Sequence, residues 1–374
     1  MEPLLSGPRV LSTATAVPPH CVEQRETKEF ARELFAGKFR DLERLLPVFD
    51  NGLIETRHFC QPLEWFEREW TFPERNGLYI EHALELSEKA GRRCLDRVGA
   101  KLEEIGALFF VSTTGISTPS LDAKLLFRLG LSPNLKRIPV WGLGCVGGAA
   151  GVARAADYAR AHPDELVLVV AVEICSLTFQ AGDSSKSNLV ASSLFADGAA
   201  AVLLGRGEGP EILGSHATTW PNTEDVMGWD LVETGLKVRF ARSVSQIVRT
   251  RTRATVEEAC KVHDLAPEDI RHLVVHPGGV KVLEAYEEAL RLKPGSLDLP
   301  REVLREYGNM SSVSVLFVLE RFLKSYPPGS GEYGIISSAR SWSRPARPRA
   351  APSIPVPSVL RGGFGSSGAS KRAR

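Results

Sequence analysis

The chain has 374 residues, 43% of them hydrophobic and 7% aromatic, which is typical of a globular protein with a substantial core. The 46 lysines and arginines balance 45 aspartates and glutamates, so a net charge of +1 gives no sign of a nucleic acid or anionic membrane as partner. No apolar run is long enough for membrane insertion, and the N-terminus lacks the pattern of a signal peptide. Six scattered cysteines predict a cytoplasmic location without disulfides or a bound metal.

Strands and helices alternate along the first part of the chain. In order, the patterns predict a strand from Arg9, a helix over 24–35, an irregular exposed segment over 51–66, a helix over 81–98, a strand over 105–112, a helix over 121–129, and strands over 135–141, 166–175 and 199–204. The run over 166–175 is almost wholly apolar, which indicates a strand buried on both faces. Glu173 lies inside this run, and a buried carboxylate needs hydrogen-bond partners.

The stretch 206–210 is the best candidate boundary between two halves, 1–205 and 206–338. The second half is predicted to contain helices over 247–263, 280–292, 301–307 and 313–323 and strands over 273–275 and 334–336. This alternation predicts an α/β fold whose sheets are covered on both sides. Residues 339–374 are rich in Pro, Arg, Ser and Gly and lack apolar periodicity, which predicts a disordered tail.

Cys145 lies where a predicted strand gives way to a helix of very small residues, including Gly147, Gly148 and Gly151. A helix with so little side-chain bulk forms poorly by itself, so we expect other backbone to pack closely against it. At the start of a helix, backbone N–H groups and the helix dipole favour the thiolate, which is the nucleophilic form of cysteine. The alternative is an ordinary buried cysteine.

Two further residues occupy similar positions. His276 ends a predicted strand and Asn309 lies in a turn before a helix, and sites of open α/β sheets gather at such ends. A histidine there can take the proton of the thiol, and a neutral asparagine amide can donate a hydrogen bond to an oxyanion or enolate. Taken singly, His276 is more simply a strand-end histidine and Asn309 a helix cap.

Together these segments resemble the type III polyketide synthases, the chalcone synthase-like branch of the thiolase superfamily. The resemblance covers about residues 9–338 and is carried by 144–151, 172–179, 194–200, 276–279 and 307–312. It implies an α/β fold of thiolase-like αβαβα layers with two pseudo-repeated halves. It also implies a homodimer without metal or cofactor, whose substrates are the coenzyme A thioesters of a starter acyl group and of malonate.

The resemblance implies an acyltransferase with three catalytic residues. Cys145 would hold the starter acyl group as a thioester. His276 and Asn309 would stabilise the oxyanion of that transfer and then the enolate formed when malonyl-CoA loses CO₂. The enolate would attack the thioester, and cyclisation would give a pyrone- or resorcinol-type product.

The resemblance further implies substrate contacts at Phe195, Thr178, Cys175, Val238, Gly278 and Gly279. Phe195 matches an aromatic gate between the coenzyme A tunnel and the acyl cavity, and the small Val238 suits a fatty acyl starter. Phe195 and Thr178 alternatively pack in the core. From the residues alone, Arg57 is a candidate to contact a phosphate, although a solvated surface arginine is the more common situation.

The tail departs from the family, which normally continues after the segment matching 334–338 with a Gly-Phe-Gly-Pro-Gly-type loop and another strand. Here the chain reads Ala-Arg-Ser-Trp-Ser over 339–343. Arg-Ser-Trp can be encoded as CGG-TCC-TGG, and one frame over that DNA reads Gly-Pro-Gly, which suggests a frameshift near Ser338. Two alternatives stay open. One is a ketoacyl synthase of the fatty-acid initiating type, which shares Cys, His and Asn, and the other is a thiolase-fold protein that is catalytically impaired because the C-terminal cavity loop is missing.

Overall fold

A computed structural model describes residues 7–221, 223, 226–241, 243–325 and 332–338. All of them belong to one compact unit, Met1–Arg344. The tail predicted over 339–374 lies outside the described residues. The division into halves at 206–210 stays a prediction.

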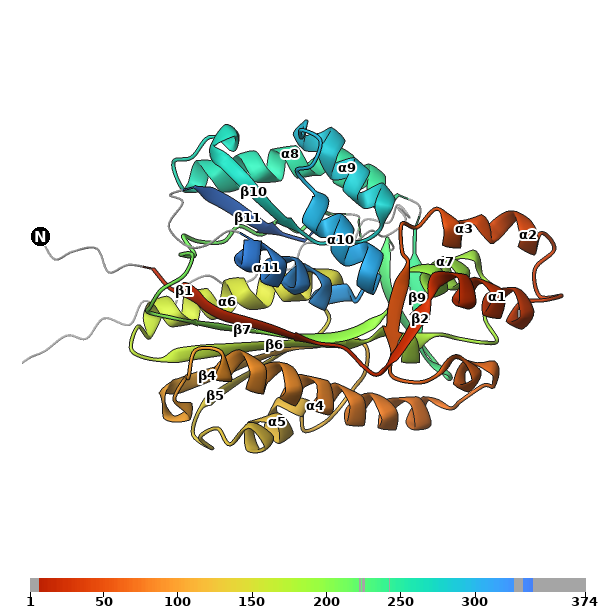
Figure 1. Cartoon of the computed structure of the whole chain (residues 1–374), viewed down its shortest axis with the longest axis horizontal. Coiled ribbons are helices and arrows are strands. Elements are labelled where there is room, and N and C mark those ends of the chain that lie inside the picture. Colours follow the sequence, from red (N-terminus) through yellow and green to blue (C-terminus); the bar gives the residue numbers. More distant parts are fainter. Residues whose placement is uncertain (1–6, 222, 224–225, 242, 326–331, 339–374) are drawn as a thin grey trace, which may run out of the picture. The chain divides into compact units, whose positions relative to one another are not determined.

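A five-stranded mixed sheet forms the centre of this unit (Figure 1). Its strand order is β1 (Arg9–Ala16), β7 (Asp197–Gly205), β6 (Leu166–Ile174), β4 (Ile105–Val111) and β5 (Lys136–Val140). The β1–β7 and β7–β6 pairs are antiparallel, whereas β6, β4 and β5 run parallel. Every residue of β7 is buried, as is nearly all of β6, so the expectation of a doubly covered strand over 166–175 is confirmed.

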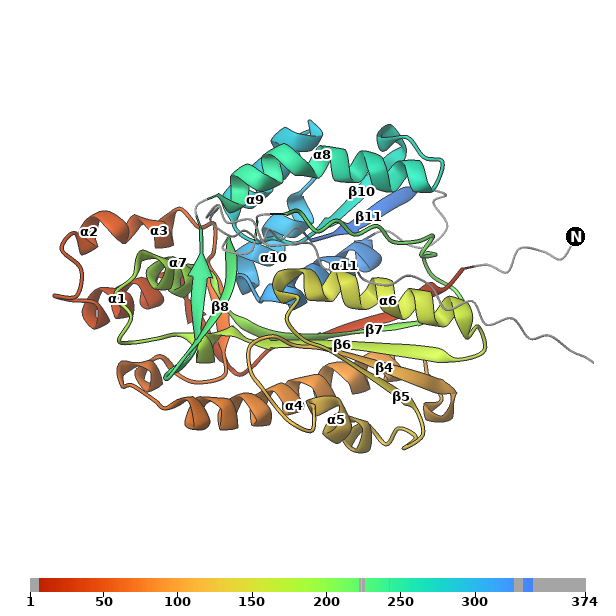
Figure 2. The ribbon, with the colours of Figure 1, turned by 180° about the vertical axis from the view of Figure 1, so that it is seen from behind.

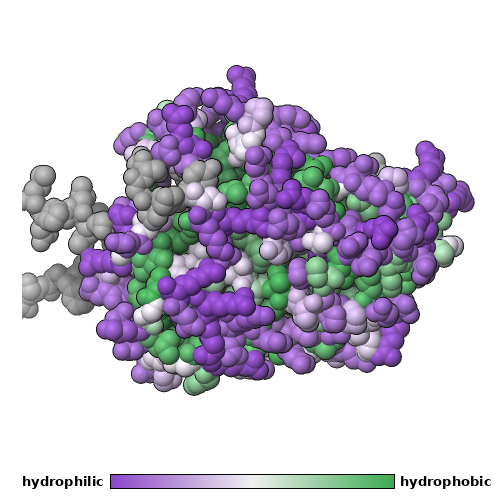
Figure 3. Space-filling view, in the orientation of Figure 1, coloured by the Kyte–Doolittle hydropathy of each residue, from purple (hydrophilic) through white to green (hydrophobic). Residues whose placement is uncertain are grey.

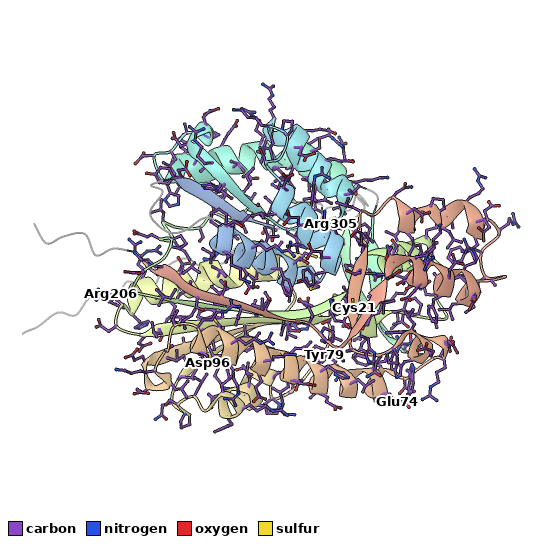
Figure 4. All side chains as sticks on the ribbon, viewed as in Figure 1. Cys21, Glu74, Tyr79, Asp96, Arg206 and Arg305 are labelled. Atoms are coloured by element: carbon purple, nitrogen blue, oxygen red, sulfur yellow. The ribbon has the colours of Figure 1, made fainter. Side chains whose placement is uncertain are left out.

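Helices cover both faces of this sheet. One face carries α4 (Phe72–Asp96) and α5 (Leu121–Leu129), and the other carries α6 (Gly147–Ala161) and α11 (Ser314–Ser325), as Figures 1 and 2 show. The start of α4 lies well before the predicted residue 81, because Thr71 and Glu74 form a capping box there. In Figure 4, Glu74 and Asp96 mark the two ends of this helix.

A second, smaller sheet lies beyond α11. In the described residues it consists of β10 (Ile270–Val275) and β11 (Tyr333–Ser337), which pair in parallel. Its far side is covered by α8 (Val244–Val262) and α9 (Val280–Leu290), where Val248, Val275 and Leu283 share one hydrophobic cluster (Figure 1). The order helix, sheet, helix, sheet, helix confirms the expected αβαβα layering.

The remaining helices and strands are β2 (His20–Glu23), α1 (Gln24–Leu34), α2 (Leu42–Leu45), α3 (Pro47–Asp50), β3 (Thr56–Phe59), α7 (Lys186–Leu194), β8 (Met227–Val232), β9 (Gly235–Phe240) and α10 (Asp298–Tyr307). Polar side chains cover most of the face shown in Figure 3, with smaller hydrophobic patches between them. None of the helices in the described part of the chain is long and apolar enough to cross a membrane.

The expectation of an irregular exposed segment over 51–66 is wrong. Strand β3 pairs antiparallel with β2, and Arg57 and Phe59 are its buried positions. An arginine at a buried position hides the alternation of polar and apolar residues by which a strand is normally identified. The sequence patterns also did not predict α7, β8 and β9.

The small residues of α6 let other segments approach it closely, as expected. A Cβ atom on Gly148 would collide with the backbone carbonyl oxygen of Ser312, and one on Gly147 would lie 2.7 Å from a methyl group of Val111. Helix α6 therefore packs directly against the turn that leads into α11. Residues from both predicted halves meet at this point.

We expect Gly148→Ala to lower the free energy of unfolding by about 1–3 kcal/mol, because backbone must move to admit the methyl group. Gly77 in the exposed interior of α4 has open space around its Cβ position. Gly77→Ala is therefore the control, and it should raise stability by roughly 0.5–1 kcal/mol. Urea denaturation of both variants checks this, and a Gly148→Ala protein as stable as the parent contradicts the close contact.

Candidate active site

Cys145 lies in a short 3-10 turn, Gly144–Val146, immediately before α6. Gly142 and Gly144 have φ values of +88° and +53°, a conformation that glycine adopts without strain, and they turn the chain from β5 into this helix. Cys145 is 4% exposed, and its Sγ lies 3.5 Å from Oγ of Ser311. The cysteine thus stands at the start of a helix, as the sequence predicts.

Asn309 is held by both its backbone and its side chain. Its backbone N–H donates to the Leu194 carbonyl (2.8 Å), and its carbonyl accepts from the Ala196 N–H (3.0 Å). The side-chain Nδ2 donates to the Gly278 carbonyl (3.0 Å), and Oδ1 accepts from the Ser311 N–H (2.9 Å). Asn309 therefore links the turn after β10 to the serine that contacts Cys145.

His276 directly follows β10, and its backbone N–H donates to the Ser337 carbonyl (2.9 Å). The imidazole is 3% exposed, and neither ring nitrogen has a hydrogen-bond partner among the described residues. Burial lowers the pKa of His276 to about 4, so the ring is neutral at pH 7. A neutral imidazole with an unused N–H is a ready donor to a developing negative charge.

Glu173 has the partners that its burial requires. Its carboxylate accepts from the Thr113 N–H (3.0 Å) and from the hydroxyls of Thr113 (2.9 Å), Thr114 (2.9 Å) and Ser312 (2.6 Å). Burial raises the pKa of this carboxyl, and the hydrogen bonds oppose that shift. Glu173 thereby fixes the turn beside Cys145, because Ser312 follows the residue that contacts the thiol.

A pocket with a cavity volume of about 60 Å³ lies beside this cluster. Its lining is Thr27, Phe30, Ala31, Leu34, Phe35, Arg57, Phe59, Leu63, Phe66, Cys175, Ser176, Thr178, Phe179, Asn188, Ala191, Ser192, Phe195 and Val238. Five predicted substrate contacts thus share one largely apolar pocket. The other two, Gly278 and Gly279, lie instead in the turn after His276, and Phe195 forms a β-bridge with Asn309.

The exposed position expected around Arg57 is wrong. The side chain is fully buried, and its Nη1 donates to the carbonyls of Ser192 (2.7 Å) and Phe195 (2.8 Å). The pairing of β3 with β2 brings it inside the protein. A buried guanidinium that already donates to two carbonyls does not suit the phosphate contact considered from the sequence.

The sequence analysis missed the linking role of Asp197. Its carboxylate accepts from the N–H groups of Cys60 and Ser176, both at 2.8 Å, and from the Ser176 hydroxyl (2.5 Å). Burial raises the pKa of Asp197 to about 6. It joins the end of β3 to the pocket wall, and the only signal for this in the sequence is an aspartate at the start of an apolar strand.

Comparisons with known proteins agree over most of the chain. The family model for chalcone and stilbene synthases, N-terminal domain, matches residues 6–208, and the model for the C-terminal domain matches 211–334. A putative chalcone synthase of Bacillus subtilis (strain 168) is 41% identical over 345 residues, covering 88% of this chain and 94% of the relative. The 1,3,6,8-tetrahydroxynaphthalene synthase of Streptomyces peucetius subsp. caesius is 37% identical over 337 residues, covering 88% and 89%.

Solved structures give the same result. The crystal structure of 1,3,6,8-tetrahydroxynaphthalene synthase from Streptomyces coelicolor A3(2), a bacterial type III polyketide synthase, superposes with a TM-score of 0.82 at 31% identity. The match covers 87% of this chain and 93% of that one. The type III polyketide synthase domain of Steely1 from Dictyostelium gives a TM-score of 0.80 at 28% identity, covering 86% and 93%.

The burial of His276 should make stability depend on pH. Its pKa is about 4 in the folded protein and near the ordinary 6.5 in the unfolded chain, so the unfolded state binds more protons between these values. The contribution of this group is therefore complete above pH 6.5 and falls by about 3 kcal/mol as the pH drops to 4. Urea denaturation of the wild type and His276→Gln from pH 7 to 4 measures it, and a pH-independent difference between them contradicts the assignment.

Proposed function

The chain belongs to the chalcone and stilbene synthase family, the type III polyketide synthases, and we propose that Cys145, His276 and Asn309 carry out its condensation of malonyl-CoA with an acyl-CoA starter. The observation that carries this assignment is the hydrogen-bonded cluster around Asn309. It joins the turn after His276 to Ser311, and Ser311 contacts the thiol of Cys145.

In the first step, the Cys145 thiolate attacks the carbonyl carbon of the starter thioester. The new carbon–sulfur bond gives a tetrahedral oxyanion, which collapses to the acyl-enzyme and expels the coenzyme A thiolate. A neutral His276 can donate one ring N–H to this oxyanion. The Asn309 amide has two hydrogens, of which the bond to the Gly278 carbonyl uses one, so the other remains to donate as well.

In the second step, malonyl-CoA loses CO₂, and the electron pair of the broken carbon–carbon bond passes into an enolate. The enolate carbon attacks the Cys145 thioester, forms the new carbon–carbon bond and releases the thiolate. No strong base is needed, because decarboxylation itself creates the nucleophile. Neutral donors suit this step, whereas a carboxylate in place of Asn309 would repel the enolate.

The pocket supports a fatty acyl starter. Six phenylalanines line it, and Val238 and Ala191 leave room among them, so an extended alkyl chain would be removed from water there. Repeated extension and cyclisation would then yield a pyrone- or resorcinol-type product. Three relatives are named for 1,3,6,8-tetrahydroxynaphthalene, which makes that compound the product to test against.

Because the chain belongs to the chalcone and stilbene synthase family, the alternative of a ketoacyl synthase no longer applies. The question of impairment concerns the tail, which lies outside the described residues. We retain the hypothesis of a frameshift near Ser338, and resequencing the gene refutes it if no shifted frame restores the Gly-Pro-Gly loop. A cytoplasmic location also remains a proposal, supported by six scattered cysteines without the spacing of a disulfide framework.

The central experiment incubates the purified chain with acyl-CoAs of increasing length and labelled malonyl-CoA. We expect labelled products from long-chain starters, read by mass spectrometry, and a loss of roughly 10⁴-fold or more in Cys145→Ala. A second protein with the reading frame repaired after Ser338 runs in parallel. Products from neither protein contradict the proposed function, while products from the repaired protein alone assign the defect to the tail.

We also propose that two copies of the chain associate through β5. This strand is at the edge of the central sheet, and Ile116, Trp141 and Leu143 nearby are exposed apolar side chains. Unpaired strand edges and exposed apolar groups are typical of interfaces. Sedimentation should give twice the mass of one chain, and Trp141→Glu should shift it towards a monomer. A wild type that sediments as a monomer at micromolar concentration contradicts this.

A further inference from the structure

Strand β3 lies along the end of α10, just before Asn309 (Figures 1 and 4). The Thr56 hydroxyl donates to the carbonyl of Glu306 (2.8 Å). The ring of His58 stacks on that of Tyr307, with centroids 5.9 Å apart and an interplanar angle of 24°. Neighbouring residues of β3 therefore hold neighbouring residues at the end of α10.

Arg57 lies between these two contacts and packs against Gly308. A Cβ atom on Gly308 would lie 2.8 Å from Cγ and 2.9 Å from Cδ of Arg57, so only a glycine admits the arginine stem here. Gly308 has a φ of +67°, which also favours glycine. The stem of Arg57 therefore occupies the space beside the residue that immediately precedes Asn309.

The guanidinium end of Arg57 holds the second segment that contacts Asn309. Its Nη1 donates to the carbonyls of Ser192 and Phe195 at the end of α7. The last carbonyls of a helix lack partners within the helix and carry partial negative charge, so a cation there is stabilising. The guanidinium lies 5.1 Å from the centroid of the Phe59 ring and is attracted by the charge of Asp197.

The end of α7 in turn binds the backbone of Asn309 on both sides. The Leu194 carbonyl accepts from the Asn309 N–H, and the Ala196 N–H donates to the Asn309 carbonyl. Arg57 therefore touches both segments whose relative position places the Asn309 amide. A small shift of a hydrogen-bond donor greatly reduces the stabilisation that it gives to an oxyanion, because the donor must lie at hydrogen-bond distance from the charge.

We propose that Arg57 is a positioning residue for Asn309, with Thr56 in a supporting role. The proposal rests on the proposed function in one respect, namely that the Asn309 amide stabilises the enolate of malonyl-CoA. Lysine is not equivalent, because its ammonium group is a compact and more strongly hydrated charge than a guanidinium, so its burial beside Gly308 costs more. The inference concerns the precision of the site, since Arg57 itself does not touch the reacting atoms.

A double-mutant cycle tests this with the decarboxylation of malonyl-CoA to acetyl-CoA as the readout. We expect Arg57→Met to slow decarboxylation by about tenfold or more in the wild type and by less than about threefold in Asn309→Ala, because the second protein has no amide left to misplace. The matched control is Arg75→Met. Arg75 on α4 is also buried and donates to the Phe179 carbonyl. Its loss should therefore slow decarboxylation by the same factor in the wild type and in Asn309→Ala.

Milder variants keep the test decisive where Arg57→Met does not fold. Thr56→Val removes only the bond to Glu306, and Arg57→Lys keeps the charge and most of the stem. Each should show the same dependence on Asn309 with a smaller loss, and Arg57→Lys should recover part of the rate lost in Arg57→Met. If each variant slows decarboxylation by the same factor in the wild type and in Asn309→Ala, the proposal is overturned.

Hydrogen exchange separates this proposal from the proposed function, because it needs no activity. The amides of the segment 306–312 should exchange faster in Thr56→Val and in the Arg57 variants than in the wild type and Arg75→Met. Unchanged exchange overturns the positioning role. A wild type that does not decarboxylate malonyl-CoA instead contradicts the proposed function, and the exchange result still decides whether Arg57 braces the Asn309 turn.

Discussion

The site depends on the close approach of α6 to the turn that leads into α11. Because Gly148 has no side chain, the Ser312 carbonyl lies against the helix backbone, and Ser311 reaches the thiol of Cys145. The same turn is also fixed by the Ser312 hydroxyl, which donates a hydrogen bond to the carboxylate of Glu173. Residues far apart in the sequence thus meet in one closely packed turn, and a bulkier helix would separate Cys145 from Ser311.

The periodic parts of the fold could be predicted from the sequence. Helix α5 has the predicted bounds 121–129, the apolar run of β6 predicted a strand buried on both faces, and the apolar run over 199–204 predicted the strand β7. Helix α7 was missed because its short stretch of serine, asparagine and small apolar residues has no clear amphipathic period. Strand β3 was missed because the residue at its centre is a buried arginine. In both segments, tertiary contacts and not the local sequence pattern determine the secondary structure.

The site could be predicted only in part. Glycines around Cys145 indicated a turn before a helix, and the apolar surroundings of Glu173 indicated that it must have partners. The identity of those partners, Thr113, Thr114 and Ser312, follows from the packing of three separate segments, which no local pattern reveals. The bracing of Asn309 by β3 is likewise a product of the fold.

The buried imidazole of His276 has an evolutionary consequence. A ring whose two nitrogens are shielded from water and bonded to no described residue makes the folded protein less stable than an apolar side chain of similar size would. An apolar substitution of similar size at this position would therefore be favoured in a chain that is selected for folding alone. A buried histidine of this kind is therefore expected to persist where function, and not folding alone, is under selection.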